Sequence, residues 1–332
     1  MNETETKNIN SARMANLLFV VIIAVYTLLY TFVSLLEVKG IKLNIVVNLL
    51  VSQMVIFVPG LIFFLLLGKT DKSNGMFTKI KPVTALLFVV FTWLLMPLIT
   101  LVNVFSQFFT TNAVVNISGD VLKLPFIFML LIIGVIGPFS EEFVFRGLIY
   151  RSLSFKTGRH IASAIVSALF FGLMHMNLNQ FAYALVLGVV LAIIDEIFDS
   201  IWPSVICHIV VNSQNVIMMY VSDILITKVY GEGFSEYSKQ VTESMEVAGS
   251  MNSTLVVMCI VLLFVSVIST GLAGLLLYGI CSIEGKLDKL RTIFLRDVNK
   301  KEKVIYPAGY VGIAVCVFFM FLLEPLIRFL QA

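Results

Sequence analysis

Long apolar runs that carry no polar face at helical or strand spacing dominate this chain. A membrane-spanning helix needs about 20 mostly apolar residues. Runs of that kind recur along the whole sequence and cover residues 14–36, 43–68, 83–107, 124–152, 159–177, 180–198, 202–223, 254–281 and 307–330. The pattern therefore predicts an all-α, polytopic membrane helix bundle of about eight or nine transmembrane helices.

Composition agrees with a membrane protein. Of 332 residues, 59% are hydrophobic and only 13% are charged, and the mean hydropathy is +1.00. The first apolar run is long and lacks a small-residue cleavage site, so we expect a true span and not a signal peptide. The net charge of +3 is small, and basic loops that face anionic lipid account for it, so we expect no nucleic-acid partner.

Lys and Arg are distributed unevenly between the connecting segments. With the N-terminus in the cytoplasm, the inner segments hold sixteen of them and the outer segments six. Because cytoplasmic loops carry an excess of Lys and Arg, we expect a multi-pass cell-membrane protein with a cytoplasmic N-terminus and an outside C-terminus. Two polar excursions are expected, an outer loop near 224–253 and an inner loop near 282–304 that contains an amphipathic surface helix.

We divide the chain into three regions. Residues 1–123 hold spans with almost no ionisable groups and are interpreted as a scaffold. Residues 124–223 hold the candidate chemistry, and residues 224–332 hold the last two spans with the charged inner loop. In the eighth span, Ser266, Thr270 and Gly274 follow one another at four-residue spacing, which favours a close helix contact.

Ionisable and amide side chains interrupt three of the apolar runs. Such residues cost at least a few kcal/mol in hydrocarbon, so they are rare there and usually functional. Their types are those that activate water and bind an oxyanion, which suggests hydrolysis inside a membrane. They are Glu141, Glu142, Arg146, His175, His208 and Asn212.

The first cluster follows a Gly137-Pro138 pair, which should kink or break the helix and restart it. Glu142 and Arg146 are four residues apart and face each other, so we expect a buried ion pair. Glu141 points about 100° away, so its charge is less compensated and it is the better candidate for a general base. Taken alone, both glutamates could equally form one structural network with the arginine.

The other two clusters contain histidine. Phe171 and His175 share a helix face, and Gly172 permits a close helix approach, although a single histidine in a span is more often a packing residue. His208 and Asn212 lie one turn apart on one stripe, and a lipid-facing pair would be costly, so they point at something polar. Glu141 and His175 lie roughly 18 and 25 Å along their helices from the 153–158 loop, so tilting or unequal helix ends must bring them together.

These motifs resemble a known family. Glu-Glu-x-x-x-Arg, Phe-x-x-x-His and His-x-x-x-Asn, in this order on three nearby spans, are similar to the three motifs of the CPBP intramembrane proteases. That family includes the type II CAAX prenyl endopeptidases and bacterial relatives linked to bacteriocin processing and self-immunity. The flanks Phe145-Arg146-Gly147 and Trp202-Pro203-Ser204 fit as well. The resemblance covers residues 135–215 and implies about eight membrane helices around a cavity open to the cytoplasmic leaflet.

The resemblance also implies roles for the six residues. Glu141 and His175 would activate the attacking water, and His208 and Asn212 would stabilise the oxyanion. Glu142 and Arg146 would support the site structurally. The family is often described as metalloproteases, and Glu141, His175 and His208 would be the zinc ligands if zinc is present. The His-Glu-x-x-His zinc helix is absent and an oxyanion hole needs no metal, so we assign no metal and favour a glutamate-activated water.

The sequence thus predicts an intramembrane endopeptidase whose substrate is a membrane-associated peptide or a pheromone or bacteriocin precursor. The alternative is a non-catalytic immunity or scaffold protein that binds a peptide or a partner membrane protein on the same fold. A proton-coupled transporter would also use intramembrane Glu and His, but the chain shows no matched pair of broken helices in two halves.

Overall fold

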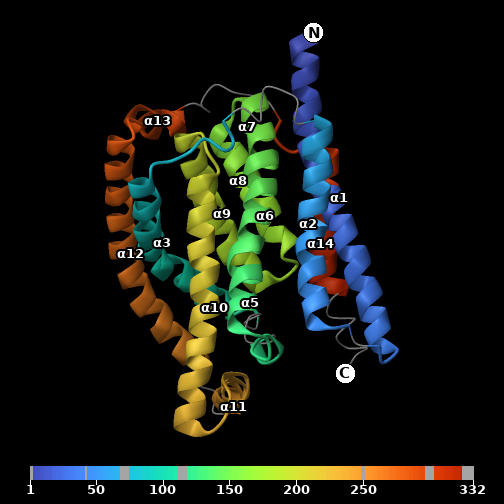
Figure 1. The fold of residues 1–332 in the computed structure, drawn as a ribbon, viewed down its shortest axis with the longest axis vertical. Coiled ribbons are helices and arrows are strands. Elements are labelled where there is room, and N and C mark those ends of the chain that lie inside the picture. Colours follow the sequence, from blue (N-terminus) through green and yellow to red (C-terminus); the bar gives the residue numbers. More distant parts are fainter. Residues whose placement is uncertain are drawn as a thin grey trace.

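The computed structural model describes residues 3–41, 43–67, 75–110, 118–247, 251–295 and 303–323, and in these ranges the chain is helical without a named strand (Figure 1). The described helices begin with α1 (Glu3–Val38), α2 (Ile45–Leu67), α3 (Pro82–Ser106), α5 (Phe126–Met129), α6 (Gly137–Glu142), α7 (Arg151–Thr157) and α8 (His160–Met174). They continue with α9 (Leu178–Phe198), α10 (Trp202–Tyr230), α11 (Phe234–Val247), α12 (Met251–Ile283), α13 (Leu287–Thr292) and α14 (Pro307–Phe318).

Seven of the described helices are long and apolar enough to cross a membrane, and two more, His160–Met174 and Pro307–Leu322, are apolar but shorter. The predicted all-α polytopic bundle is therefore confirmed. At 1.5 Å per residue, α8 is about 22 Å long, less than the roughly 30 Å of a hydrocarbon core. The helix α8 is therefore too short to cross the membrane, and its last residues lie within the bundle.

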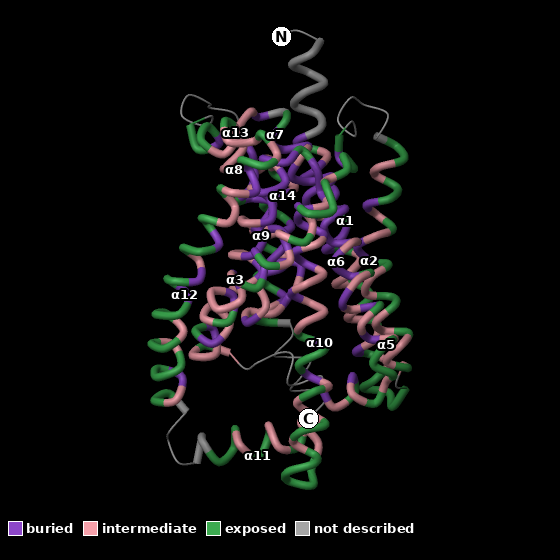
Figure 2. Tube along the Cα trace, turned by 60° about the vertical axis from the view of Figure 1, so that its left-hand side comes forward, coloured by how far each residue is buried: buried purple, intermediate pink, exposed green. Residues whose placement is uncertain are grey.

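The helices form one bundle around a central group that contains α6, α8, α9 and α10, with α1, α2 and α14 on one side and α3 and α12 on the other (Figure 1). Buried residues gather in this centre and towards the end that carries α7 and α13, while the outer faces of α2 and α12 are largely exposed (Figure 2). The last described helix, α14, packs against both α1 and α8, so the C-terminal region contacts the central helices.

The predicted break at Gly137-Pro138 is wrong. Residues Phe126–Thr157 form one continuous helical run in which two π-helical segments, η1 (Leu130–Ile136) and η2 (Phe143–Tyr150), flank α6. The amide of Gly137 donates to the carbonyl of Ile132, five residues back. A wider π turn can accommodate a proline that lacks an N–H without ending the helix. The glutamates therefore lie inside a helix and not in the first turn of a restarted one.

The continuous run also resolves the predicted mismatch in depth. The helix continues through α7 to Thr157, so Glu141 lies about 22 to 24 Å from the turn at Gly158, and His175 lies about 22 Å beyond the start of α8. Both residues therefore reach the same depth. Gly158 has φ +63°, which suits the left-handed end of α7 and lets the chain reverse directly into α8.

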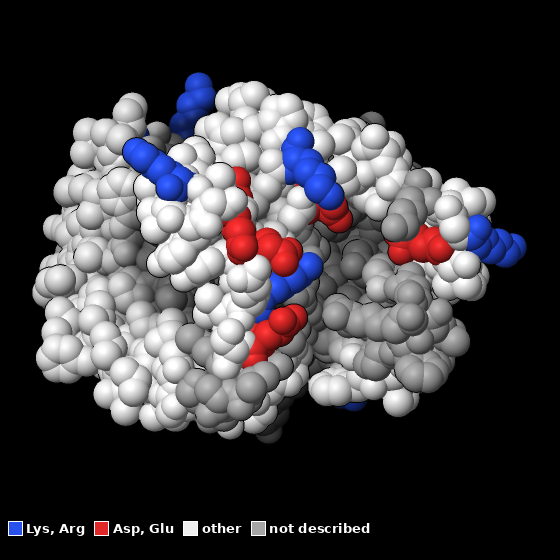
Figure 3. Space-filling view, turned by 90° about the horizontal axis from the view of Figure 1, so that it is seen from below, with Lys and Arg blue, Asp and Glu red and all other residues white. Residues whose placement is uncertain are grey.

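The outer excursion is shorter than predicted. α10 continues to Tyr230 because no residue that breaks a helix comes before Gly231, which ends it with φ +78°. The segment 224–253 therefore consists mostly of helix, the end of α10 followed by α11. On the face that carries α11, acidic and basic side chains are interspersed (Figure 3).

The inner excursion contains the expected helix, α13, but only over six residues. Lys286 and Lys289 bind the carboxylate of Asp199, which follows α9. Partial burial alone would raise the pKa of Asp199, but hydrogen bonds and charge from the two lysines outweigh it and hold that pKa below its usual value. Residues 296–302 of the predicted 282–304 loop lie outside the described residues.

The predicted contact of α12 is only partly right. α12 packs along α3, and Ser266, Ser269 and Ala273 are buried on its inner face. A Cβ placed on Gly274 would meet no atom within 4 Å. Gly274 therefore faces away from α3, because the contact follows a three- and four-residue alternation and not a strict four-residue step.

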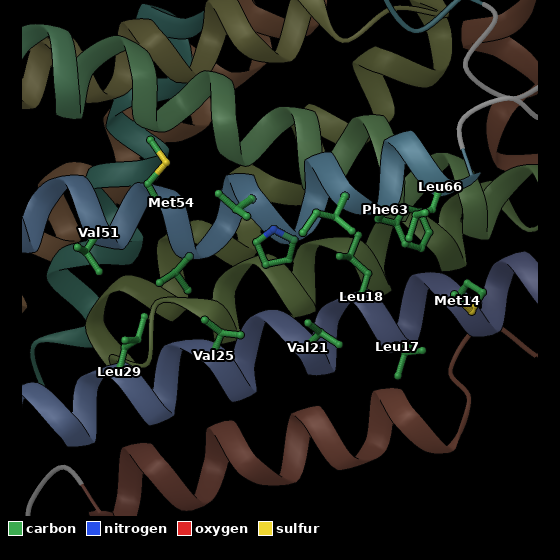
Figure 4. Close-up of a pocket in the computed structure, with 14 residues that line it drawn as sticks. Met14, Leu17, Leu18, Val21, Val25, Leu29, Val51, Met54, Phe63 and Leu66 are labelled. Atoms are coloured by element: carbon green, nitrogen blue, oxygen red, sulfur yellow. The ribbon is translucent and has the colours of Figure 1, made fainter.

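A groove of about 570 Å³ separates α1 from α2, and all fourteen side chains that line it are apolar, among them Leu18, Val25 and Phe63 (Figure 4). None of them carries a hydrogen-bonding group, so the groove cannot activate water. Both helices belong to the region interpreted as scaffold. Helices from all three predicted regions pack into one bundle, so the packing shows no boundary between the regions. The three-region division therefore stays a prediction.

The orientation in the membrane stays a prediction as well, and reporters can test it. A reporter inserted in the 282–304 loop should signal from the cytoplasm, and one inserted next to α11 should signal from outside, because the charge asymmetry places the basic loops inside. An outside signal from the 282–304 loop would overturn the topology. Signals from the same side at both positions would show that α12 does not cross.

Candidate active site

A buried ion pair lies at the centre of the bundle. Arg146 Nε is 3.0 Å from Glu142 Oε2, and neither side chain is exposed. The four-residue spacing predicted this pairing, which the contact confirms. The guanidinium carbon lies 4.3 Å from the centroid of the Phe171 ring, a cation–π contact. A Cβ on Gly188 would lie 3.1 Å from Arg146 Nη2, so glycine lets α9 pack directly against the guanidinium.

His208 binds the same carboxylate from α10. Its Nδ1 lies 2.7 Å from Glu142 Oε1, and only 3% of the residue is exposed. Because Glu142 is paired with Arg146, we treat it as an ionised acceptor, so Nδ1–H donates to it. The other ring nitrogen, Nε2, lies 3.8 Å from Glu141 Oε2. Glu142 thus fixes the ring of His208 so that its second nitrogen faces Glu141.

Glu141 is the carboxylate that the arginine does not bind. It is 9% exposed, and its Oε2 is buried and accepts no hydrogen bond from any described residue. The 3.8 Å to His208 is beyond hydrogen-bonding distance. An acceptor oxygen therefore remains for a proton from water or substrate, whereas both oxygens of Glu142 contact cationic or donor groups.

His175 forms the C-terminal end of α8, where Nδ1 lies 2.9 Å from the carbonyl oxygen of Phe171. A carbonyl only accepts, so Nδ1–H donates and Nε2 remains unprotonated in the neutral ring. Its ring meets Phe171 edge to face at 5.0 Å, and the ring of His208 does the same at 5.7 Å. His175 also lies within electrostatic range of Glu141 and His208. One aromatic ring therefore separates and orients the two histidines.

Asn212 lies one turn after His208 on α10, as predicted, and its Nδ2 donates to the carbonyl oxygen of Ile133 at 3.2 Å. Its neighbour Ser213 donates to the carbonyl oxygen of Gly134 at 3.3 Å. Both carbonyls belong to the π-helical segment η1, where wider turns leave backbone oxygens for side chains to bind. A Cβ on Gly134 would lie 2.8 Å from Ser213 Oγ, so glycine is needed for this approach.

A further carboxylate fixes the start of α10. Asp195 of α9 is buried and accepts from both the backbone amide of Ser204, at 3.0 Å, and its hydroxyl, at 2.6 Å. Ser204 precedes His208 by one turn. The pair therefore anchors the first turn of α10 to α9 and sets the height at which His208 meets Glu142.

Ser204→Ala should lower the stability of the purified protein, because Asp195 would keep a buried carboxylate oxygen without its hydroxyl donor. A buried group left unsatisfied costs about 1–3 kcal/mol. Thermal unfolding in detergent measures the loss. Ser52→Ala is the matched control, since among the described residues that hydroxyl donates to the Leu49 carbonyl of its own helix and to no other helix. Equal melting temperatures for the two variants would contradict an anchoring role for Asp195.

The proposed zinc ligands do not form a metal site in the described residues. No group of three His, Cys, Asp or Glu side chains in that part of the chain is arranged to hold a metal ion. His208 Nδ1 is directed at Glu142, and His175 Nδ1 is directed at a backbone carbonyl. These contacts leave Nε2 of each histidine free, and metal-bound histidines donate their other N–H in the same way. The assignment of no metal therefore stays a prediction, and we derive no step through a metal.

The sequence reasoning missed three features of this site. Asp195 is an intramembrane carboxylate, a signal that the sequence did offer. Phe171 was noted only for sharing a face with His175, yet it contacts Arg146 and His208 as well. The π-helical segments were not predicted, and the Gly137-Pro138 pair that marks them was interpreted as a break.

Comparison with known proteins identifies the same segment. Residues 123–214 match the family described as type II CAAX prenyl endopeptidase Rce1-like. Over 90 residues the chain is 29% identical to the "Putative membrane peptidase YdiL" of Bacillus subtilis (strain 168), a match that covers 27% of this chain and 36% of that protein. No solved structure matches this chain.

The matched segment contains the clustered residues from Glu141 to Asn212 and the two π-helical segments. Residues 123–214 are therefore similar to an Rce1-like core, which supports the CPBP resemblance that the three motifs indicated.

Proposed function

We propose that this chain is an intramembrane endopeptidase in which Glu141 activates the attacking water. The observation that carries the proposal is the unequal environment of two adjacent carboxylates: Glu142 lies 3.0 Å from Arg146 Nε and 2.7 Å from His208 Nδ1, whereas Glu141 has no ion pair with the arginine and lies 3.8 Å from His208 Nε2. A carboxylate held near a reacting water without a permanent counter-ion is suited to general-base work.

The reaction follows from the positions of these groups. Glu141 takes a proton from water as the water oxygen attacks the carbonyl carbon of the scissile peptide bond. His175, within electrostatic range of Glu141, assists by holding that water through Nε2. The tetrahedral intermediate collapses as the proton is delivered to the departing amine, which leaves a new carboxyl end and a new amino end.

The negative oxygen of the intermediate needs donors. His208 supplies one through Nε2, and since Nδ1–H already donates to Glu142, this requires the doubly protonated ring. Asn212 has two amide hydrogens, and the bond to Ile133 uses one of them. The second can be directed at the oxyanion when substrate is bound.

The substrate class follows from the location. These residues lie within a membrane bundle, and Glu141 and His175 are about 22 to 24 Å along their helices from the turn at Gly158. The substrate is therefore a membrane-associated peptide, and a pheromone or bacteriocin precursor fits that description. Comparing the membrane peptidome of cells that make the wild-type chain with cells that make Glu141→Gln tests this assignment. Peptides that are shortened only with the wild type support it, and identical peptidomes contradict it.

Asn212→Ala should reduce turnover by about 100- to 1000-fold, the usual cost of one oxyanion donor, with peptide affinity largely kept. The same residue holds α10 to η1 through Ile133, so a structural role must be distinguished. Turnover, peptide affinity and melting temperature are measured together, with Ser213→Ala as the neighbouring control that also loses a bond to η1. A lowered melting temperature with normal turnover would remove the oxyanion role.

A further inference from the structure

A second cavity lies at the end of the bundle that carries α7 and α13, away from the glutamates. Its volume is about 650 Å³, and three chain segments form it: α1, the start of α8, and the segment that enters α14. Three cationic side chains line it, one from each segment. They are Arg13, Arg159 and Lys303.

The remaining walls of this basic cavity are mostly apolar or aromatic. Ala162 and Val166 come from α8, while Ile305, Tyr306 and Tyr310 come from the other side. The guanidinium carbon of Arg13 lies 5.5 Å from the centroid of the Tyr306 ring, which holds that cation at the cavity wall. No acidic residue is among those that line the cavity in the described part of the chain. The site thus combines concentrated positive charge with a surface that suits hydrocarbon.

The cavity is built into the fold. Asn16 of α1 is fully buried, and its amide donates to the carbonyl oxygen of Val304 at 3.2 Å. Its carbonyl oxygen accepts from the amide of Tyr306 at 3.1 Å. A Cβ on Gly309 would lie 2.1 Å from the same oxygen, so glycine is required for this approach. The segment that contributes Lys303 and Tyr306 is therefore fixed against α1.

The N-termini of two helices add to the positive electrostatic potential of the cavity. α8 begins at His160, next to Arg159, and α14 begins at Pro307, next to Tyr306. Each helix is longer than ten residues, and the backbone amides at its N-terminus favour a negative charge. The apolar part of α1 starts at Ala12, beside Arg13. All three apolar helices thus begin at the cavity, which places it at the boundary between membrane and water.

From this arrangement we propose that the basic cavity binds the phosphate headgroup of an anionic membrane lipid, with the acyl chains directed along α8 and α14. A phosphate diester matches the cations and the two helix N-termini, and the aromatic and apolar walls suit the glycerol and the first methylene groups. Free inorganic phosphate would use the charges but not those walls. The inference does not depend on the peptidase proposal.

The test uses the full chain, purified in detergent and stripped of lipid, with native mass spectrometry as the readout. The probes are phosphatidylglycerol, phosphatidylcholine and inorganic phosphate. We expect phosphatidylglycerol to bind more tightly than phosphatidylcholine and Arg13→Gln/Lys303→Gln to weaken it by about 30-fold, as expected for two basic groups at a membrane surface. Both side chains are exposed, so the fold should tolerate the change.

The matched control is Lys79→Gln/Arg291→Gln. Both are exposed basic residues and neither lines the cavity. Arg291 belongs to α13, and Lys79 lies two residues before Lys81, which pairs with Glu284 close to α13. This pair should change phosphatidylglycerol binding by less than about threefold, because it removes equal charge from outside the site. Equal weakening by both pairs would overturn the proposal, since general surface charge would then explain binding. Equal binding of the two lipids, or of phosphate and phosphatidylglycerol, would overturn it as well.

Two further variants keep the test decisive if the double variant unfolds. Arg13→Lys/Arg159→Lys retains the charges and should bind phosphatidylglycerol within a few-fold of the wild type. Lys303→Glu changes one exposed side chain and should weaken binding by at least tenfold. Wild-type affinity in Lys303→Glu would show that the cavity is not the lipid site.

Discussion

Glu141→Gln should remove nearly all peptide cleavage while the protein keeps its fold. The amide has the shape of the carboxylate but cannot take a proton from water, and loss of a general base typically costs about 100- to 10,000-fold in turnover. Glu141 takes no part in the ion pair with Arg146, so its replacement leaves that pair intact. Cleavage of a reporter peptide by the purified chain gives turnover, and thermal unfolding verifies the fold.

The control for this variant is Glu243→Gln, the same chemical change on the exposed surface of α11, which should leave cleavage unchanged. Wild-type cleavage in Glu141→Gln would move the base to another residue. Peptide binding without cleavage in both the wild type and Glu141→Gln would instead favour the alternative interpretation, a non-catalytic immunity or scaffold protein on the same fold.

Arg146→Ala should destabilise the protein by about 3–5 kcal/mol, because it leaves the carboxylate of Glu142 buried without its main counter-charge. Arg146→Lys should cost less. Lysine keeps the positive charge, although it loses the planar group that stacks on Phe171. The measurement is the melting temperature of each variant in the same detergent, at a fixed protein concentration.

A third variant separates lost charge balance from lost packing. Glu142→Gln in the Arg146→Ala background removes the negative charge that has lost its counter-ion. If that unpaired carboxylate causes the destabilisation, the double variant should regain part of the lost stability. Because His208 also binds Glu142, that restoration should be incomplete. Equal melting temperatures for Arg146→Ala and the wild type would contradict a stabilising pair.

Much of this architecture could be predicted from the sequence. Apolar runs of sufficient length must become helices in a bilayer, since every backbone group there has to be paired within the protein. The spacing of Glu142 and Arg146 predicted their contact, because side chains four residues apart meet on any α-helix. The same reasoning placed His208 and Asn212 on one stripe, and the motifs indicated the CPBP family, which the comparisons confirm.

Other features depended on contacts between distant segments. The sequence could not show that the carboxylate of Glu142, which pairs with Arg146, also binds His208, 66 residues further along the chain. It also could not show that η1 offers its carbonyls to Asn212 and Ser213. Such pairings depend on how helices are packed side by side, which no local pattern specifies.

The sequence by itself determined where the long apolar helices run and which few polar side chains the membrane region must accommodate, since these follow from local hydrophobicity and the cost of burying charge. The tertiary structure alone decided the division between the two glutamates. Glu142 meets the cation and the histidine, and Glu141, its direct neighbour, does not meet the cation. The physical reason is that adjacent residues on a helix face different neighbours. The packing of α10 and α2 on α6, and of α8 and α9 on η2, therefore gives two identical side chains different electrostatic surroundings.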